Sequence, residues 1–98
     1  MIYYLENYHL KYHASIQQFL QMTKQLNFYS TSHCHLCELA HSILIQLSED
    51  IEVTLIDIAD NETLFIKYGL RIPVLQRKDT LVELDWPFSE IELHKFIN

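Results

Sequence analysis

Hydrophobic and polar positions change their period along the chain, and the changes predict strands and helices in turn. An apolar stretch over about 25–30 predicts a strand, and apolar residues spaced three and four apart predict a helix over about 34–48. Residues 51–58 begin by alternating and then become fully apolar, as in a buried strand. Together these elements make a βαβ unit, whose two strands run parallel with a right-handed crossover.

The second half of the chain predicts a short helix, a hairpin and a last helix. The short helix covers about 61–68, with Asp60 as its N-cap and Gly69 ending it in a left-handed conformation. Strands over 73–77 and 80–84 form the hairpin, with a tight turn at residues 78–79. Ser89 and Glu92 have the spacing of a capping box, which begins the last helix.

The first 24 residues differ from the rest and predict a partly helical N-terminal extension to a domain over 25–98. A helix over roughly 13–24 is expected, because apolar residues with helical spacing form one face along it. Residues with the same spacing before position 13 could extend this face toward the N-terminus. The residues of this face are Ile16, Phe19, Leu20 and Thr23, with Leu5, Tyr8 and Tyr12 before them. Met22 lies just before the first strand and offers a second place at which the compact domain would begin.

Length and charge exclude several classes of protein. A chain of 98 residues has room for one core, and 49% hydrophobic with 20% charged residues is a globular composition. The net charge of -6 and seven scattered basic residues argue against a nucleic-acid partner. Neither a membrane-spanning apolar stretch nor a secretory signal is recognised, so a cytoplasmic location is expected.

Cys34 and Cys37 are the only cysteines, and they lie where the first strand gives way to a helix. A thiol at the first turn of a helix lies at the positive end of the helix dipole, which lowers its pKa and favours the reactive thiolate. Two cysteines in a cytosolic chain point to catalysis, redox sensing or metal binding more than to a structural crosslink. The pair therefore predicts redox chemistry.

Two segments resemble the small bacterial glutaredoxin-like proteins of the thioredoxin-fold superfamily. They are Tyr29–Leu44, YSTSHCHLCELAHSIL, and Tyr68–Leu75, YGLRIPVL, and the resemblance covers about 25–97. It implies an α/β, thioredoxin-like βαβ-ββα fold with a four-stranded mixed sheet. The first and last helices would lie on one face of this sheet and the short helix on the other.

The resemblance also implies an activity, thiol–disulfide exchange, and roles for four residues. Cys34 would be the attacking thiolate, and Cys37 the resolving thiol that releases the mixed disulfide. Pro73 would follow a cis peptide bond, and the backbone of Ile72 would hydrogen-bond an extended substrate segment beside the cysteines. The expected partners are disulfide-containing proteins or small-thiol disulfides, and the sequence does not identify the reducing system.

Further substrate contacts are expected from His35, Leu36 and Arg71. His35 and Leu36 stand between the cysteines, where typical dithiol glutaredoxins have Pro-Tyr, and Arg71 could contact a carboxylate or a partner chain. No bound cofactor is predicted. Glutathione is a candidate co-substrate through the resemblance, but residues 85–89 replace the glycine-containing turn that holds it in typical relatives.

Two other functions are compatible with these residues. One is a redox-sensing or partner-binding module without turnover. The other is metal binding by the cysteines together with His33, His35 or His41. Crowded ligand geometry and a cis-proline packed on the cysteines disfavour the metal site, so none is predicted. A protonated histidine that stabilises the Cys34 thiolate is the alternative role for these imidazoles.

Overall fold

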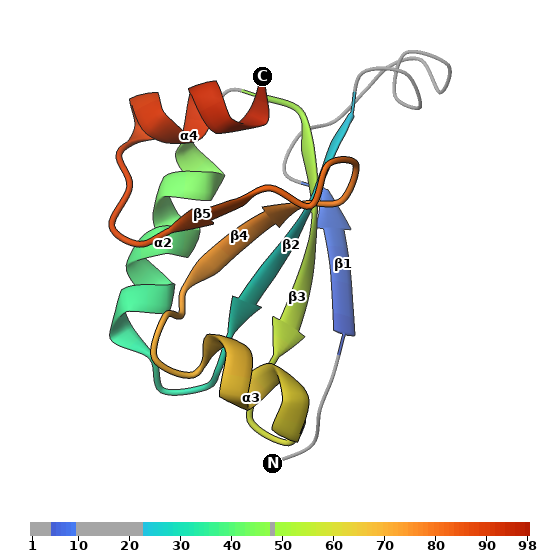
Figure 1. The fold of residues 1–98 in the computed structure, drawn as a ribbon. Helices are drawn as coiled ribbons and strands as arrows, with labels where there is room; N and C mark the ends of the chain where they lie inside the picture. Colours follow the sequence, from blue (N-terminus) through green and yellow to red (C-terminus); the bar gives the residue numbers. More distant parts are fainter. Residues whose placement is uncertain (1–4, 10–22, 48) are drawn as a thin grey trace.

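The computed structural model describes residues 5–9, 23–47 and 49–98, which form a five-stranded mixed sheet with helices on both faces (Figure 1). The elements in chain order are β1 (Leu5–His9), β2 (Lys24–Ser30), α2 (His35–Gln46), β3 (Ile51–Asp57), α3 (Glu62–Tyr68), β4 (Val74–Arg77), β5 (Glu83–Asp85) and α4 (Glu90–Ile97). The strand order is β1-β3-β2-β4-β5. Strands β2 and β3 are parallel, and the other neighbouring pairs are antiparallel.

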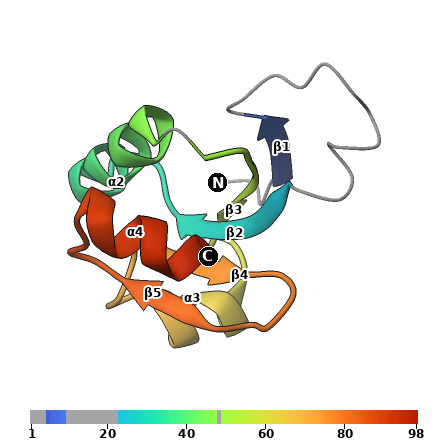
Figure 2. The same cartoon turned by 90° about the horizontal axis from the view of Figure 1, so that it is seen from above.

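The predicted βαβ-ββα arrangement of four strands and three helices is confirmed for β2 to α4. Helices α2 and α4 cover one face of the sheet and α3 covers the other, as Figure 2 shows from above. The capping box at the start of α4 is also present, with reciprocal hydrogen bonds between Ser89 and Glu92. The periodicity was sufficient here because each of these elements buries one regular face.

The N-terminal region contains a strand where a helical face was predicted, so the sheet has five strands. Leu5–His9 is β1 and pairs with β3 in the register Leu5↔Ile56. The predicted helix over 13–24 lies mostly outside the described residues, but its last residue, Lys24, begins β2. Tyrosine-rich segments favour strands over helices, and this preference was the competing signal.

Three local predictions in the second half were wrong. Asn61, not Asp60, is the N-cap of α3, and its side chain accepts a hydrogen bond from the Leu64 N–H at 3.0 Å. Gly69 has a right-handed conformation with φ -55°, so it is not needed for a positive φ. Glycine fits here because it has no side chain: a Cβ at this position would stand 2.5 Å from the Phe65 carbonyl oxygen.

The hairpin turn is longer than predicted. Residues 78–82 connect β4 to β5, and Leu81 has the positive φ of 66° that the turn requires. The turn is held by two backbone hydrogen bonds, from Arg77 N–H to the Val82 carbonyl and from Leu81 N–H to the Arg77 carbonyl, both 2.9 Å. The bulky apolar residues of this segment suggested a strand, and their backbone conformation could not be read from hydrophobicity.

The main apolar core lies between the sheet and helices α2 and α4. Its fully buried members include Leu26, Phe28, Ala40, Leu44 and Leu93. A smaller cluster lies on the α3 face and includes Tyr29, Ile56, Tyr68 and Val74. Successive residues of β2 thus alternate between the two cores, and the carboxyl ends of β2 and β3 carry the chain to the same end of the sheet.

Candidate redox-active site

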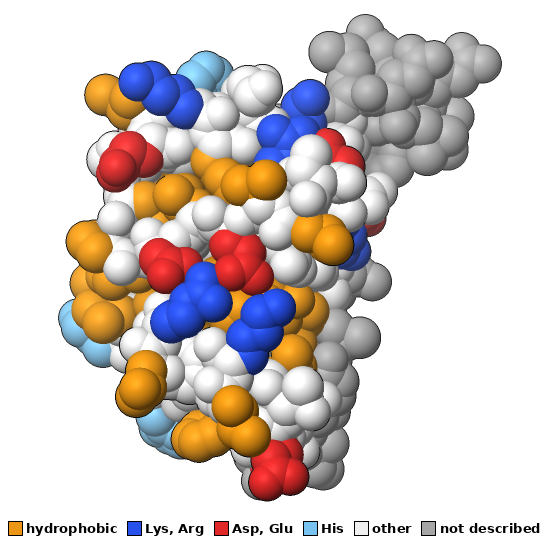
Figure 3. All heavy atoms as spheres, in the orientation of Figure 1, with side chains coloured by type: hydrophobic (Ala, Val, Ile, Leu, Met, Phe, Trp, Pro, Cys, Tyr) orange, Lys and Arg blue, Asp and Glu red, His pale blue; other side chains and the backbone are white. Residues whose placement is uncertain are grey.

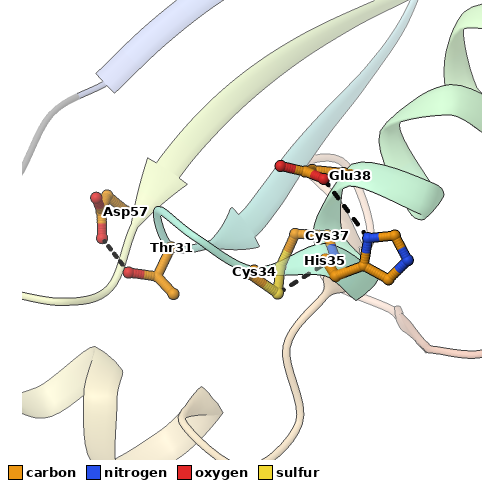
Figure 4. Close-up of a disulfide and its surroundings, with 6 residues drawn as sticks. All are labelled: Thr31, Cys34, His35, Cys37, Glu38 and Asp57. Carbon is orange, nitrogen blue, oxygen red and sulfur yellow. Dashed lines mark hydrogen bonds and ion pairs between the residues drawn. A yellow bond between two sulfur atoms is a disulfide. The ribbon is translucent and has the colours of Figure 1, made fainter.

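A disulfide joins Cys34 and Cys37 at the carboxyl end of β2, where the chain turns into α2 (Figure 4). Cys34 is the N-cap of α2, and its Sγ accepts a hydrogen bond from the backbone N–H of Cys37 at 3.2 Å. The two Cα atoms are 5.2 Å apart. The first free N–H groups of a helix and its dipole both favour negative charge at this point. The fold therefore places Cys34 where a thiolate would be stabilised.

The two sulfur-bearing residues differ in exposure. Cys37 is buried, with 6% of its surface exposed, on the helix face that also buries Ala40 and Leu44. Cys34 is only half-buried at the tip of the helix. Since a thiolate must reach the substrate sulfur, this difference favours Cys34 as the first nucleophile.

The loop before Cys34 is tied to the end of β3 by Asp57. The Thr31 hydroxyl donates to Asp57 Oδ1 at 3.2 Å (Figure 4). The Ala59 N–H donates to the same oxygen at 2.8 Å. Asp57 is 2% exposed, and its Oδ2 has no hydrogen-bond partner among the described residues. Asp57 therefore caps the end of the strand. His33 completes the loop with a positive φ of 58°.

A cis peptide bond between Ile72 and Pro73 lies at the same end of the sheet, as predicted. Pro73 is buried, and the next residue, Val74, pairs with Tyr29 near the end of β2. The Ile72 N–H donates to the Tyr68 carbonyl at 3.0 Å. None of the backbone hydrogen bonds in the turns and loops of the described residues has the Ile72 carbonyl as its acceptor.

Arg71, just before Ile72, is held by two carboxylates of its own chain. Its Nη2 lies 2.6 Å from Glu83 Oε1 and 2.7 Å from Asp85 Oδ1, and its Nε donates to Asp85 Oδ2 at 3.2 Å. The guanidinium carbon also stands 5.2 Å from the centre of the Tyr68 ring. Figure 3 shows basic and acidic side chains side by side near the centre of this face. The charge of Arg71 is thus balanced within the molecule.

Polar residues continue this network across the α3 face of the sheet. The Tyr68 hydroxyl donates to Glu83 Oε2 at 2.6 Å, and Gln76 accepts from Asn27 at 3.0 Å and from the Tyr29 hydroxyl at 2.9 Å. The rings of Tyr29 and Tyr68 stack with centroids 4.0 Å apart. These contacts connect the cis-proline turn to β2, the strand that leads into the loop before Cys34.

The network shifts the pKa values of its members. Burial, followed by the hydrogen bond to Glu83, raises the pKa of the Tyr68 hydroxyl well above its usual value. Burial also acts to raise the pKa of the Glu83 carboxyl, but hydrogen bonds from Tyr68 and Arg71 outweigh it and the net pKa is lowered. Hydrogen bonds to Asp85 and Glu83 raise the pKa of Arg71. Glu83 therefore remains a carboxylate and Tyr68 a phenol at neutral pH.

On the other side of the disulfide, toward β3, lies an open groove of about 450 Å³. Phe28 and Leu55 are the apolar residues that the sheet contributes to its lining, and the His41 ring stacks on Phe28 with centroids 6.2 Å apart. Residues 30–33, from the last residue of β2 into the loop after it, line one side, and Glu38 and Ser42 of α2 line another. Both cysteines contribute to the lining. A group attached to Cys34 could therefore extend into this groove.

The residues between the cysteines face outward. His35 is largely exposed, and its Nδ1 lies 3.6 Å from Glu38 Oε1. Leu36 is 46% exposed. Both are accessible to a partner bound over the disulfide. Their contact with substrate, like that of Arg71, stays a prediction.

Two further properties of the described residues bear on metal binding and on membrane insertion. No cluster of three or more His, Cys, Asp or Glu side chains that could hold a metal ion occurs within residues 5–9, 23–47 and 49–98. The helices of the same segments are also too short or too polar to cross a membrane.

Sequence reasoning missed Glu83, Gln76 and Tyr68, and also His41 as part of the groove. Gln76 stands two residues after Val74 in a strand, so the alternation of β4 already placed it on the α3 face. A buried polar residue at such a position needs a partner, which was the available signal. The second cis bond, between Trp86 and Pro87, was not predicted.

Comparisons with known proteins agree with this geometry. Residues 25–98 match the model of the glutaredoxin-like domain (DUF836) family. The chain is similar to the crystal structure of a structural genomics target protein, XcR50 from X. campestris, with 36% identity over 72% of this chain and 92% of that one, and a TM-score of 0.64. The solution structure of XcR50 gives 35% identity over 72% and 88% of the chains and a TM-score of 0.60. No protein with a curated description matches. On the family match and this likeness, the chain belongs to the glutaredoxin-like domain (DUF836) family.

Proposed function

We propose that this protein is a thiol–disulfide oxidoreductase of the cytoplasm, with Cys34 as the attacking thiolate and Cys37 as the resolving thiol. The observation that carries the proposal is the difference between the two cysteines. Cys34 caps α2 and accepts the Cys37 N–H, whereas Cys37 is buried one turn deeper. This is the arrangement that a two-step exchange requires.

The reaction proceeds in two balanced exchanges. The Cys34 thiolate attacks one sulfur of a substrate disulfide, a Cys34–substrate disulfide forms, and the other substrate sulfur leaves as a thiolate that takes up a proton. Cys37 then loses its proton and attacks Cys34 Sγ, which forms the internal disulfide and releases the second substrate thiol. The substrate gains two electrons and the protein loses two. An external thiol or dithiol reductant reduces Cys34–Cys37 and closes the cycle.

The surroundings support binding of a disulfide-containing protein or a small-thiol disulfide. The Ile72 carbonyl lies beside the buried Pro73, and an N–H of an extended substrate segment could donate to it. His35 and Leu36 are exposed over the disulfide and offer side-chain contacts. Arg71 contributes through its position before Ile72, since its charge is already paired with Glu83 and Asp85.

Trapping of the mixed disulfide tests the mechanism directly. The Cys37→Ser variant should accumulate a covalent adduct through Cys34 when challenged with an oxidised substrate, because the resolving step is removed. Intact-protein mass spectrometry should show one adduct per chain that dithiothreitol removes. The matched Cys34→Ser variant, which keeps the buried thiol, should form at least tenfold less adduct. Equal adduct on both variants, or none on Cys37→Ser, would show that the two-step mechanism is wrong.

The reduction potential of Cys34–Cys37 distinguishes a reductase from a sensor. Thiol trapping across a glutathione redox series should give a value of about -200 to -270 mV, the range of reducing glutaredoxins and thioredoxins. A pair that forms its disulfide in this series, yet turns over no disulfide when reductant is supplied, would instead be a redox-sensing or partner-binding module.

A further inference from the structure

The two sides of the disulfide differ in charge, and this difference bears on which substrates the site accepts. On the β4 side, Arg71 is paired with Glu83 and Asp85. Lys67 is the second cation there and stands 5.2 Å from the centre of the Tyr68 ring. Positive and negative groups are therefore balanced on this side, and the guanidinium is already engaged in three hydrogen bonds to carboxylates.

On the β3 side, the groove has an apolar floor and a polar rim. Phe28 and Leu55 supply the floor, and the hydroxyls of residues 30–32 and of Ser42 are the neutral polar groups of the rim. Glu38 is the one Asp, Glu, Lys or Arg among the described residues that line it. Glu38 therefore supplies the carboxylate charge of the described lining, to which Cys34 also contributes.

We infer that this groove binds the side chain next to the cysteine in a protein disulfide, and that it selects neutral or basic side chains over acidic ones. The inference rests on the proposed thiol–disulfide exchange. A volume of about 450 Å³ accommodates one or two side chains, and the apolar floor suits the methylene groups of a lysine. The Glu38 carboxylate would attract the ammonium at the end of such a side chain.

The same charges disfavour small anionic thiols. Glutathione carries two carboxylates and one ammonium at neutral pH, so its disulfides are net anionic. The part of the groove lining that the structure describes offers no Lys or Arg side chain to these carboxylates, and Arg71 on the other side is paired within the chain. A peptide segment binds more favourably than glutathione, because its backbone groups can hydrogen-bond to the hydroxyls of the rim and to the Ile72 carbonyl. The substrate class is therefore a protein disulfide with a neutral or basic flank.

The test uses three synthetic peptides, each in a mixed disulfide with the same aromatic thiol, identical except for Lys, Gln or Glu next to the cysteine. The second-order rate constant of each with the fully reduced protein is measured at pH 8 and low ionic strength. Each rate constant is divided by the rate constant of the same peptide with dithiothreitol, so that differences in the intrinsic reactivity of the peptides cancel. We expect the order Lys, Gln, Glu, with about a fivefold ratio between Lys and Glu that falls to about twofold in 0.5 M salt.

Variants locate the selection in the groove. Glu38→Gln should bring the Lys/Glu ratio to about 1, and Glu38→Lys should invert it. Ratios between peptides cancel any change that these variants cause in Cys34 itself. The matched control is Glu90→Gln, which removes a carboxylate from the first turn of another helix, α4, and should leave the ratio unchanged. A ratio that survives in Glu38→Gln would overturn the assignment to this groove.

A second variant tests the space rather than the charge. Ser42 is exposed on α2, so Ser42→Trp can fill the groove without disturbing the core. It should slow all three peptides about fivefold or more and leave bis(2-hydroxyethyl) disulfide within twofold. Equal slowing of all substrates would refute the groove as a subsite. Failure of the wild type to reduce any disulfide would refute the proposed function itself, and so the two failures are distinguishable.

Discussion

The two faces of the sheet hold the site by different kinds of interaction. Toward α2 and α4, the buried residues are apolar, and the helix that carries the cysteines is held by packing of Ala40 and Leu44. Toward α3, a small apolar cluster is continuous with a network of short hydrogen bonds that includes Glu83 and Arg71. Packing is non-directional and large in total, whereas hydrogen bonds contribute less net free energy but fix geometry.

This difference suggests a division of roles. The α2 and α4 face supplies most of the stability and brings Cys37 into the core, because fully buried apolar side chains carry the largest contributions. The α3 face fixes the turn at Ile72–Pro73, through Arg71 before it and Tyr68 beneath it. Changes on the first face should therefore alter the free energy of unfolding, and changes on the second should alter the site more than the stability.

The largest effect is expected from Leu44→Ala on the α2 and α4 face. Leu44 is fully buried, so truncation removes packing and leaves a cavity, at a cost of about 2–5 kcal/mol of unfolding free energy. Urea denaturation measures the loss, and the potential of Cys34–Cys37 should change little. The control is Leu39→Ala on the same helix, where the side chain is 41% exposed, with an expected loss below about 1 kcal/mol. Equal losses of unfolding free energy in the two variants would contradict the conclusion that this core supplies most of the stability.

On the α3 face, the largest expected effect is that of Gly69→Ala. The new Cβ would stand 2.5 Å from the Phe65 carbonyl oxygen, so the end of α3 must shift. We expect a loss of about 1–3 kcal/mol, as for other overpacked sites. Because Arg71 and Ile72 follow directly, the rate of disulfide exchange should fall several-fold as well. Thermal unfolding measures the loss of stability, and a peptide-disulfide assay measures the exchange rate. An unchanged rate would show that this turn does not influence the redox site.

The sequence was sufficient for the first face and insufficient for the second, for a physical reason. Ala40 and Leu44 follow a helical period, and the elements that bury them could be read from it. Gln76 and Glu83 meet through strand pairing, a contact that depends on register across a hairpin whose turn was predicted three residues too short. The cysteine pair was recognised from its spacing at the start of a helix and the cis-proline from the family resemblance, whereas the groove is assembled from β2, the loop after it, α2 and β3.

Glu83→Gln should alter the acid stability of the protein. The pKa of the Glu83 carboxyl is lowered in the folded state, so its contribution is complete above the usual pKa of about 4.3 and is lost as pH falls through the lowered value. The variant should lose about 1–2 kcal/mol at pH 7 and show a flatter decline below pH 5. Urea midpoints at several pH values measure this.

The control for that experiment is Glu90→Gln, an exposed carboxyl in the first turn of α4. It should leave the slope of stability against pH close to that of the wild type. If Glu83→Gln also leaves the slope unchanged, the hydrogen bonds from Tyr68 and Arg71 do not stabilise the carboxylate. In that case, charged hydrogen bonds would not distinguish the α3 face from the apolar face toward α2 and α4.

The smallest effect is expected in the hairpin turn, which belongs to neither core, and it has the opposite sign. Leu81 has a φ of 66° and is 64% exposed, so its side chain gains little burial while its backbone is strained. Asparagine tolerates this conformation, and Leu81→Asn should raise the unfolding free energy by about 0.5–1 kcal/mol. The matched change at the exposed neighbour, Val82→Asn, relieves no positive φ and should not stabilise. Since the turn touches neither the cysteines nor the cis-proline, the exchange rate should stay at the wild-type value. A change in that rate would show that the hairpin transmits strain into the polar face, and that the site depends on more of the sheet than its hydrogen-bonded end.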